Sequence, residues 1–267
     1  MTLISLSPWD LTLAACLVLL LAFTSWRLHL GVEHRLLISA ARSAVQLILL
    51  GFVLKILFEL ESLPWITLLA LFMLFVAGWE VMARQKRRYR GAWGFGIGTL
   101  SMFLSSFTVT LLALLVVIRV DPWYQPQYLI PLLGMLLGNT MSGIAIALDN
   151  LTRSAAEHRG RIEARLMLGA TWDMAISDIR RDSLRAGLIP IVNAMATAGL
   201  VSLPGMMTGQ ILAGSPPMEA AKYQLMIMFL VSAGTGLGSV AAVWLGSRRL
   251  FDERQRLRLD RLKGQRR

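Results

Sequence analysis

The sequence predicts an all-α integral membrane protein, and two observations carry that prediction. First, 55% of the residues are hydrophobic and only 16% are charged, whereas soluble domains average about 25% charged residues. Second, the chain contains apolar runs of about 20 residues, the length that a helix needs to cross a hydrocarbon core of about 30 Å. We therefore expect one transmembrane domain over residues 1–250, followed by a basic cytoplasmic tail over 251–267.

Seven such runs are present, and each is expected to form a membrane span. They cover residues 9–28, 36–58, 63–83, 94–118, 129–149, 186–212 and 219–247. The connections divide by charge: segments 27–35, 84–90, 150–185 and 248–267 hold 2, 5, 7 and 9 lysines and arginines, 23 of the 27 in the chain. Because loops rich in these residues stay in the cytoplasm, the pattern predicts an outside N-terminus and an inside C-terminus.

The net charge of +11 is then a topology signal and an attraction to the lipid surface. It does not indicate nucleic-acid binding, since the basic segments lack interleaved aromatic residues. Motifs for chemistry are also missing. No phosphate-binding G-x-x-x-x-G-K-[ST] loop occurs, so the chain has no ATPase motif of its own. Its one cysteine, Cys16, excludes a cysteine-cluster metal site. We expect neither an enzyme nor a bound metal or cofactor.

The longest internal basic connection, residues 150–185, carries an apolar stripe at helical spacing. The stripe consists of Ile162, Leu166, Gly169, Trp172, Ile176 and Ile179. An amphipathic helix of this kind can lie on the membrane surface, or it can dock into a groove of a partner. Within it, "EARLMLG" (163–169) resembles the opening of the coupling segment of ABC transporter permeases, which favours docking. The closing leucine–proline pair of that motif is absent, because Arg181 and Asp182 stand there.

Longer stretches resemble the FetB-like family of ABC permeases, described as probable iron exporters. They are "RSAVQLILLGFVLKILF" (42–58), "GMLLGNTMSG" (134–143), "LMLGAT" (166–171), "RAGLIP" (185–190), "GLVSLPGMMTGQILAG" (199–214) and "KYQLMIMF" (222–229). The resemblance implies a multi-pass, inner-membrane permease subunit that exports iron or another metal. It further implies a pair of permease copies and a separate cytoplasmic ATPase subunit that holds ATP and Mg. The residues implied in coupling to that subunit are Glu163, Ala164, Leu168, Gly169, Ala170 and Thr171. The family also includes a plant permease of aluminium tolerance, which leaves the substrate open.

Two other functions remain as alternatives. An ion-coupled secondary transporter would need acidic residues deep in the membrane, yet Glu80 and Asp149 lie near span ends. A non-transporting membrane scaffold would recruit a soluble partner through residues 150–185 and leave cellular metal unchanged.

Polar residues inside the expected spans are candidates for a transport path. Arg42 lies one turn from Gln46 in the second span. Because a midspan arginine costs about 2.5–3.5 kcal/mol on insertion scales, it is expected to snorkel to the surface, to pair with Glu80 or to line a path. Asn139 is a further candidate, although an interhelical hydrogen bond is its simpler interpretation.

The stretch "GLVSLPGMMTGQILAG" (199–214) predicts a moving joint in the sixth span. Pro204 lacks an N–H and clashes with the preceding turn, so we expect a break around Leu200–Pro204. Gly205 and Gly209 allow a neighbouring helix to approach closely. Met206 and Met207 are interpreted as adaptable packing residues of a gate, not as metal ligands.

Overall fold

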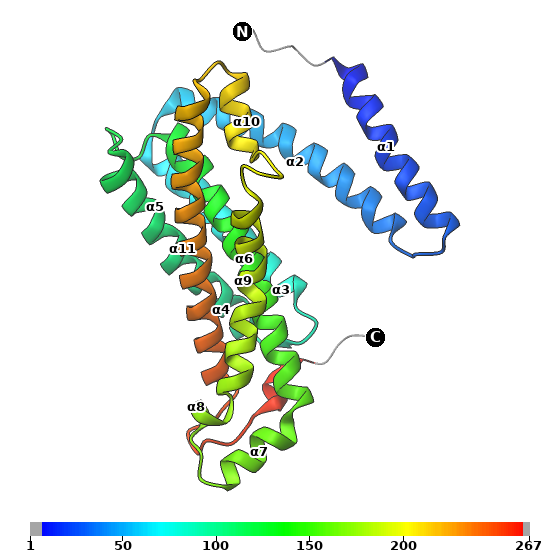
Figure 1. The fold of residues 1–267 in the computed structure, drawn as a ribbon, viewed down its shortest axis with the longest axis vertical. Helices are drawn as coiled ribbons and strands as arrows, with labels where there is room; N and C mark the ends of the chain where they lie inside the picture. The colour runs from blue at the N-terminus through cyan, green and yellow to red at the C-terminus, as the bar shows by residue number, and fades with distance from the viewer. Residues whose placement is uncertain (1–6, 264–267) are drawn as a thin grey trace.

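A computed structural model describes residues 7–263 of the chain, and its secondary structure is almost wholly helical (Figure 1). Within residues 7–263, six helical segments are long and apolar enough to cross a membrane. They are α1 (Pro8–Arg27), α2 (Glu33–Leu60), α3 (Leu63–Arg84), the segment Trp93–Ile118, α6 (Pro126–Glu157) and α11 (Pro217–Arg249). Each corresponds to one of the expected spans, so length and apolarity predicted these six correctly.

The segment Trp93–Ile118 is a continuous helix with two wider turns. It consists of α4 (Trp93–Met102), the π-helix η1 (Phe103–Phe107), α5 (Thr108–Leu112) and the π-helix η2 (Ala113–Ile118). Ser106 in η1 donates a hydrogen bond to the Thr140 hydroxyl of α6 at 3.4 Å. The wider turn therefore carries a polar contact to the neighbouring helix inside the apolar bundle.

The remaining expected span, the sixth (186–212), is not one continuous helix. The chain forms α9 (Ser177–Thr197), leaves the helical conformation over residues 198–204, and resumes in the short α10 (Gly205–Leu212). Five charged residues lie in the first half of α9: Asp178, Arg180, Arg181, Asp182 and Arg185. Because α9 begins in charged sequence and α10 has only 8 residues, neither is apolar and long enough to count as a span.

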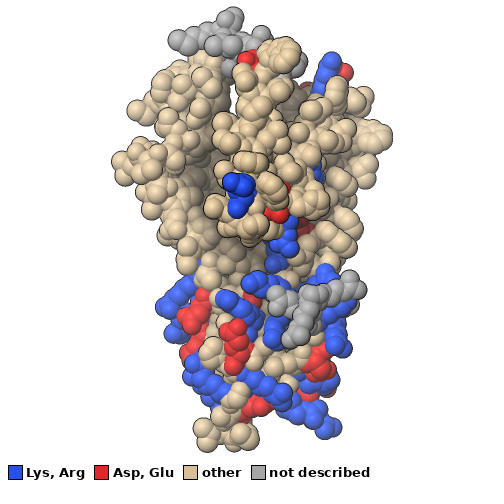
Figure 2. Space-filling view, turned by 90° about the vertical axis from the view of Figure 1, so that its right-hand side faces the viewer, with Lys and Arg blue, Asp and Glu red and all other residues tan. Residues whose placement is uncertain are grey.

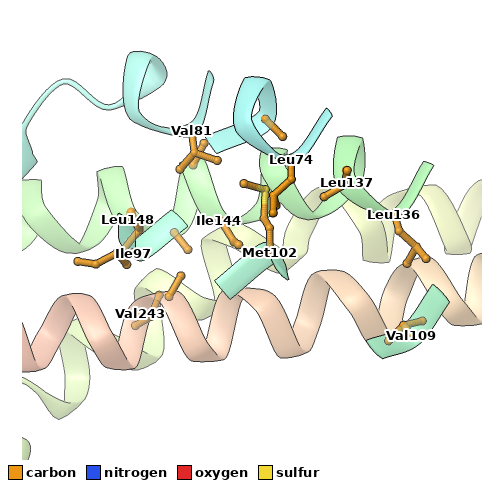
Figure 3. Close-up of a cluster of buried hydrophobic side chains, with 14 of the residues drawn as sticks. Leu74, Val81, Ile97, Met102, Val109, Leu136, Leu137, Ile144, Leu148 and Val243 are labelled. Atoms are coloured by element: carbon orange, nitrogen blue, oxygen red, sulfur yellow. The ribbon is translucent and has the colours of Figure 1, made fainter. Parts of the chain in front are cut away.

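Helix α6 lies at the centre of the bundle and packs against α3, α9 and α11. Its buried face interlocks with side chains of three other segments, as Figure 3 shows for Leu74, Met102, Ile144 and Val243. Helices α1 and α2 pack on each other and stand beside the bundle (Figure 1). Only Ala22, Ser25 and Leu57 are buried among the described side chains of this pair, as expected for helices that face lipid.

Charged side chains gather at one end of the molecule, and the zone above them is largely uncharged (Figure 2). We call this the charged end. It contains the short helices α7 (Arg159–Met167) and α8 (Trp172–Ala175), near which α6 and α11 end (Figure 1). The basic segments 150–185 and 248–263 lie at this end, whereas the α1–α2 connection, part of the basic segment 27–35, lies beside the uncharged zone (Figure 1).

The expected tail does not extend freely from the end of α11 in its described part. Its strand β2 (Leu262–Lys263) pairs antiparallel with β1 (Arg88–Tyr89), which lies between α3 and α4. Arg261 donates hydrogen bonds to the carbonyls of Arg249 and Phe251 at 2.9 and 3.0 Å. The tail therefore folds back across the charged end and ties α11 to the α3–α4 connection.

Candidate functional site

The residues expected in coupling lie on the α7–α8 turn, which we define as Glu163–Thr171. Gly169 has a φ of +88°, a left-handed conformation that glycine adopts without the steric cost of a Cβ. The Thr171 hydroxyl then accepts a hydrogen bond from the Met174 amide at 3.4 Å and caps α8. The glycine and the threonine of "LMLGAT" thus have direct geometric roles: one reverses the chain and the other starts the next helix.

The three isoleucines of the apolar stripe face inward, so the stripe is not wholly available to a membrane surface or to a partner. Ile162, Ile176 and Ile179 are all buried in the core of the chain itself. The stripe also does not lie on one helix, because the turn at Gly169 separates α7 from α8. The three isoleucines anchor the α7–α8 turn to the bundle, so neither a membrane surface nor a partner's groove is needed to cover them.

The outward side of the turn is apolar and uncovered. Met167 and Leu168 are 82% and 88% exposed, although both lie at the charged end. Beside them is a groove of about 930 Å³ between the turn and the loop Glu253–Arg258, which we call the tail loop. Of the residues expected in coupling, Glu163, Gly169, Ala170 and Thr171 line this groove, whereas Ala164 and Leu168 are exposed. Four of these six residues therefore share one accessible groove.

Two polar contacts hold the turn in place. The Arg165 guanidinium donates to Asp178 Oδ2 at 2.7 Å and connects α7 to α9. This hydrogen bond lowers the pKa of the Asp178 carboxyl below its ordinary value. The Trp172 amide donates to Gln255 Oε1 at 2.9 Å, which fixes the tail loop against α8. The tail loop was not expected at this site, and no motif in it distinguishes it from a solvated basic segment.

A second candidate site, which we call the lateral groove, lies between α2, α3 and α6. It has a volume of about 550 Å³, and Arg42, Gln46 and Glu80 line it. Arg42 Nη2 lies 2.9 Å from Glu80 Oε1, so the expected pair is formed. Arg84, one turn beyond Glu80, approaches Glu80 Oε2 at 3.7 Å. One carboxylate therefore lies between two guanidinium groups within a groove of otherwise neutral side chains.

The other expected path residues lie elsewhere. The Asn139 amide donates to the Met135 carbonyl of its own helix at 2.9 Å, and Asn139 is not among the residues that line the lateral groove. Pro204, Gly205, Met206, Met207 and Gly209 belong to α10 and its start. A Cβ at Gly205 or Gly209 would meet nothing within 4 Å, so this face of α10 has room for a neighbour. The path candidates therefore form two separate groups.

The break before α10 starts earlier than the proline that predicted it. Ala198 already has an extended ψ of 130°, and Gly199 has a φ of +80°. The Gly199 amide donates to the Ser202 carbonyl at 2.9 Å and closes a tight loop. Pro204 follows this loop as the residue that caps α10. The expected break is present, and its left-handed residue is Gly199.

Within residues 7–263, no group of three or more His, Cys, Asp or Glu side chains is placed to hold a metal ion. Cys16, which lies on α1, is exposed there.

Comparison with known proteins gives one family match. The model of the Uncharacterised protein family (UPF0014) matches residues 8–251, nearly the whole chain. The chain belongs to this family. Among UPF0014 relatives, the membrane protein slr1647 of Synechocystis is 41% identical over 89% of this chain and 90% of its own length. No solved structure matches the chain.

Two further UPF0014 relatives have names that refer to a function. The "Probable iron export permease protein FetB" of Escherichia coli is 34% identical over 95% of this chain and 96% of its own length. The "Protein ALUMINUM SENSITIVE 3" of Arabidopsis thaliana is 34% identical over 87% of this chain and 83% of its own length. With six helices that can cross a membrane, the chain is a multi-pass protein of a membrane permease family.

Proposed function

We propose that the chain is the permease subunit of an inner-membrane ABC exporter whose cargo contains a metal, with iron as the first candidate. Two copies pair in the membrane, and a separate ATPase subunit binds ATP and Mg at the cytoplasmic face. The charged end faces the cytoplasm, because basic segments are retained there. The Escherichia coli relative named as a probable iron export permease supports the choice of cargo.

The observation that carries this proposal is the exposed α7–α8 turn. Met167 and Leu168 are uncovered at the charged end. An exposed apolar surface beside a groove is typical of a protein–protein contact. The turn is anchored to the bundle by Ile162 and Ile176 on one side, so force on its outer face reaches the spans through packed side chains. That arrangement suits an ATPase that drives the permease.

The geometry also favours this function over a secondary transporter. Such a transporter needs a membrane carboxylate that binds and releases its coupling ion. Glu80 is held by Arg42 and Arg84, and Asp149 accepts a hydrogen bond from the Lys86 amide at 2.7 Å. Both carboxylates therefore already have protein partners.

The deciding experiment measures metal retention in cells that lack the gene, with and without complementation by the chain and by its ATPase subunit. We expect iron retention to fall only when both subunits are present. Unchanged retention of iron and of other metals would contradict export and favour a scaffold. Export that persists without the ATPase would instead favour a secondary transporter.

A substitution in the break between α9 and α10 tests its role as a joint. Replacing Pro204 with alanine is expected to lower export several-fold, because the ring no longer fixes φ at the start of α10. The measurement is the export rate at equal membrane abundance. Pro216→Ala is the matched control, since Pro216 caps α11 with nearly the same backbone angles. Full export by Pro204→Ala would count against a hinge at this position.

A further inference from the structure

The lateral groove continues toward the charged end into a smaller pocket, and Arg84 lines both. This pocket of about 230 Å³ is also lined by Ser142, Asp149 and Arg153. Phe72 and Arg84 mark the two ends of the groove's α3 wall, about 18 Å apart at 1.5 Å per residue. The groove and the pocket therefore form a polar track from the charged end into the apolar part of the protein.

The carboxylates of this track are occupied, whereas its arginines keep unused donors. Both Glu80 oxygens face guanidinium groups, and one Asp149 oxygen accepts from the Lys86 amide. A guanidinium has five N–H donors, and the pair with Glu80 uses one donor of Arg42. The Arg42 and Arg84 side chains are 56% and 48% exposed. Donors are therefore in excess over acceptors along the track.

Lipid chains cannot satisfy these donors, because hydrocarbon offers no acceptor. Ser39, Ser43 and Gln46 of α2 add further polar groups to the same groove. An exposed arginine below the membrane surface faces water, protein or a bound group. An occupant with several acceptor oxygens fits this lining best, since charge-assisted hydrogen bonds from guanidinium to carboxylate or phosphate are strong and often bidentate.

A bare metal cation fits the same lining poorly. The track has a net positive charge, because three arginines and two carboxylates line it: Arg42, Arg84 and Arg153, with Glu80 and Asp149. Hard cations require several oxygen ligands, whereas both oxygens of Glu80 already face guanidinium groups and one oxygen of Asp149 already accepts a hydrogen bond. The thioethers of two methionines, Met73 and Met141, line the groove and suit soft cations. The two guanidinium groups beside them oppose any cation that enters.

We propose that the lateral groove is an oxyanion-binding site, and that the cargo enters it as an anion: a metal held inside a carboxylate or phosphate chelate. Arg42 and Arg84 bind the anionic oxygens, and Ser39, Ser43 and Gln46 hydrogen-bond to the rest of the chelate. The assignment to cargo rests on the proposed function, whereas the binding chemistry rests on the groove alone.

The test measures binding to the purified full-length chain, without ATPase, in nanodiscs of neutral phosphatidylcholine. The probes are citrate, iron(III) citrate, inorganic phosphate and, as the cation, iron(II). We expect saturable binding of at least one anion and no saturable binding of iron(II). Arg42→Gln and Arg84→Gln are each expected to weaken anion binding at least tenfold. Arg35→Gln on the same helix, outside the groove, is the matched control and is expected to bind normally.

Glu80→Gln separates an anion site from a cation site by the sign of its effect. It removes the negative charge that competes for both arginines, so anion binding is expected to strengthen several-fold. A cation site would lose affinity with the same change. A monodisperse elution profile for each variant shows that its fold is intact. Saturable iron(II) binding that Glu80→Gln abolishes would overturn the proposal.

Two further arms identify the source of the anion and keep the proposals distinct. Repeating the measurement in nanodiscs with phosphatidylglycerol tests a lipid headgroup: a groove that binds this lipid and ignores the soluble anions would overturn the assignment to cargo. Anion binding without any metal export in cells would contradict the proposed function and leave the site standing. Export without anion binding would contradict the anion site and leave the proposed function standing.

Discussion

Replacing Leu168 with aspartate is expected to weaken binding of the chain to its ATPase subunit at least tenfold, which corresponds to about 1.4 kcal/mol. The side chain is 88% exposed, so the change leaves no cavity in the fold. Burying a leucine in an interface contributes about 1.5–3 kcal/mol, and a carboxylate placed there would instead have to be desolvated without a partner. The expected loss therefore comes from the contact and not from unfolding.

The measurement is the dissociation constant of the ATPase subunit from the chain in nanodiscs, together with the export rate in cells. Met174→Asp is the matched control, because Met174 is 64% exposed but lies on the adjacent α8, outside the α7–α8 turn. Equal losses for both variants would indicate a general effect of negative charge at this end. Normal binding by Leu168→Asp would contradict docking at the α7–α8 turn.

The membrane spans were predictable because length and apolarity are properties of local sequence. The pair between Arg42 and Glu80 was predictable for a related reason. Topology places both residues near the same membrane face, and a membrane-embedded charge needs a partner. Both predictions rest on the free-energy cost of placing polar groups in hydrocarbon. This cost can be assessed for each residue from the sequence alone.

The direction of the apolar stripe could not be predicted in the same way. Periodicity shows that one face of a helix is apolar, but it does not identify what covers that face. Ile162 and Ile176 are covered by the chain itself, because the left-handed Gly169 reverses the chain between them. A glycine is compatible with a turn and with a helix, so the sequence alone left the reversal open.

The tail loop shows a second limit of sequence reasoning. Gln255 reaches the Trp172 amide across 83 positions of sequence, and a glutamine among arginines carries no signal for that contact. The break before α10 was predictable only in part. Pro204 predicted its presence, whereas its left-handed residue is Gly199. The lateral groove was also predictable only in part, since the consecutive helices α2 and α3 supply the expected Arg42–Glu80 pair, whereas its third wall comes from the distant α6.

Replacing Gly187 with valine is expected to cause a large loss of stability, because it separates two helices that cross in direct backbone contact. A Cβ at Gly187 of α9 would lie 2.7 Å from the Gly143 carbonyl oxygen of α6 and 2.8 Å from Ala147 Cβ. The first contact is backbone and cannot rotate away. In the reverse direction, a Cβ at Gly143 would lie 3.1 Å from the Gly187 carbonyl oxygen. Close approach of small residues is the main source of helix association in lipid.

Overpacking of this kind typically costs about 1–3 kcal/mol, and a loss of 1 kcal/mol lowers the melting temperature of a chain of this size by roughly 2–4 °C. The measurement is thermal unfolding of the purified chain in detergent. Gly236→Val is the matched control, since a Cβ at Gly236 of α11 would meet only Leu188 Cδ2, at 4.0 Å. The two variants share the β-branched side chain and its helix propensity, so the difference between their melting temperatures isolates the crossing. Equal melting temperatures would show that α6 and α9 do not need this contact.

The same crossing joins the membrane core to the α7–α8 turn, because α6 continues toward α7 and α9 follows α8. A destabilised crossing is therefore expected to uncouple ATPase binding from transport even in the fraction of protein that remains folded.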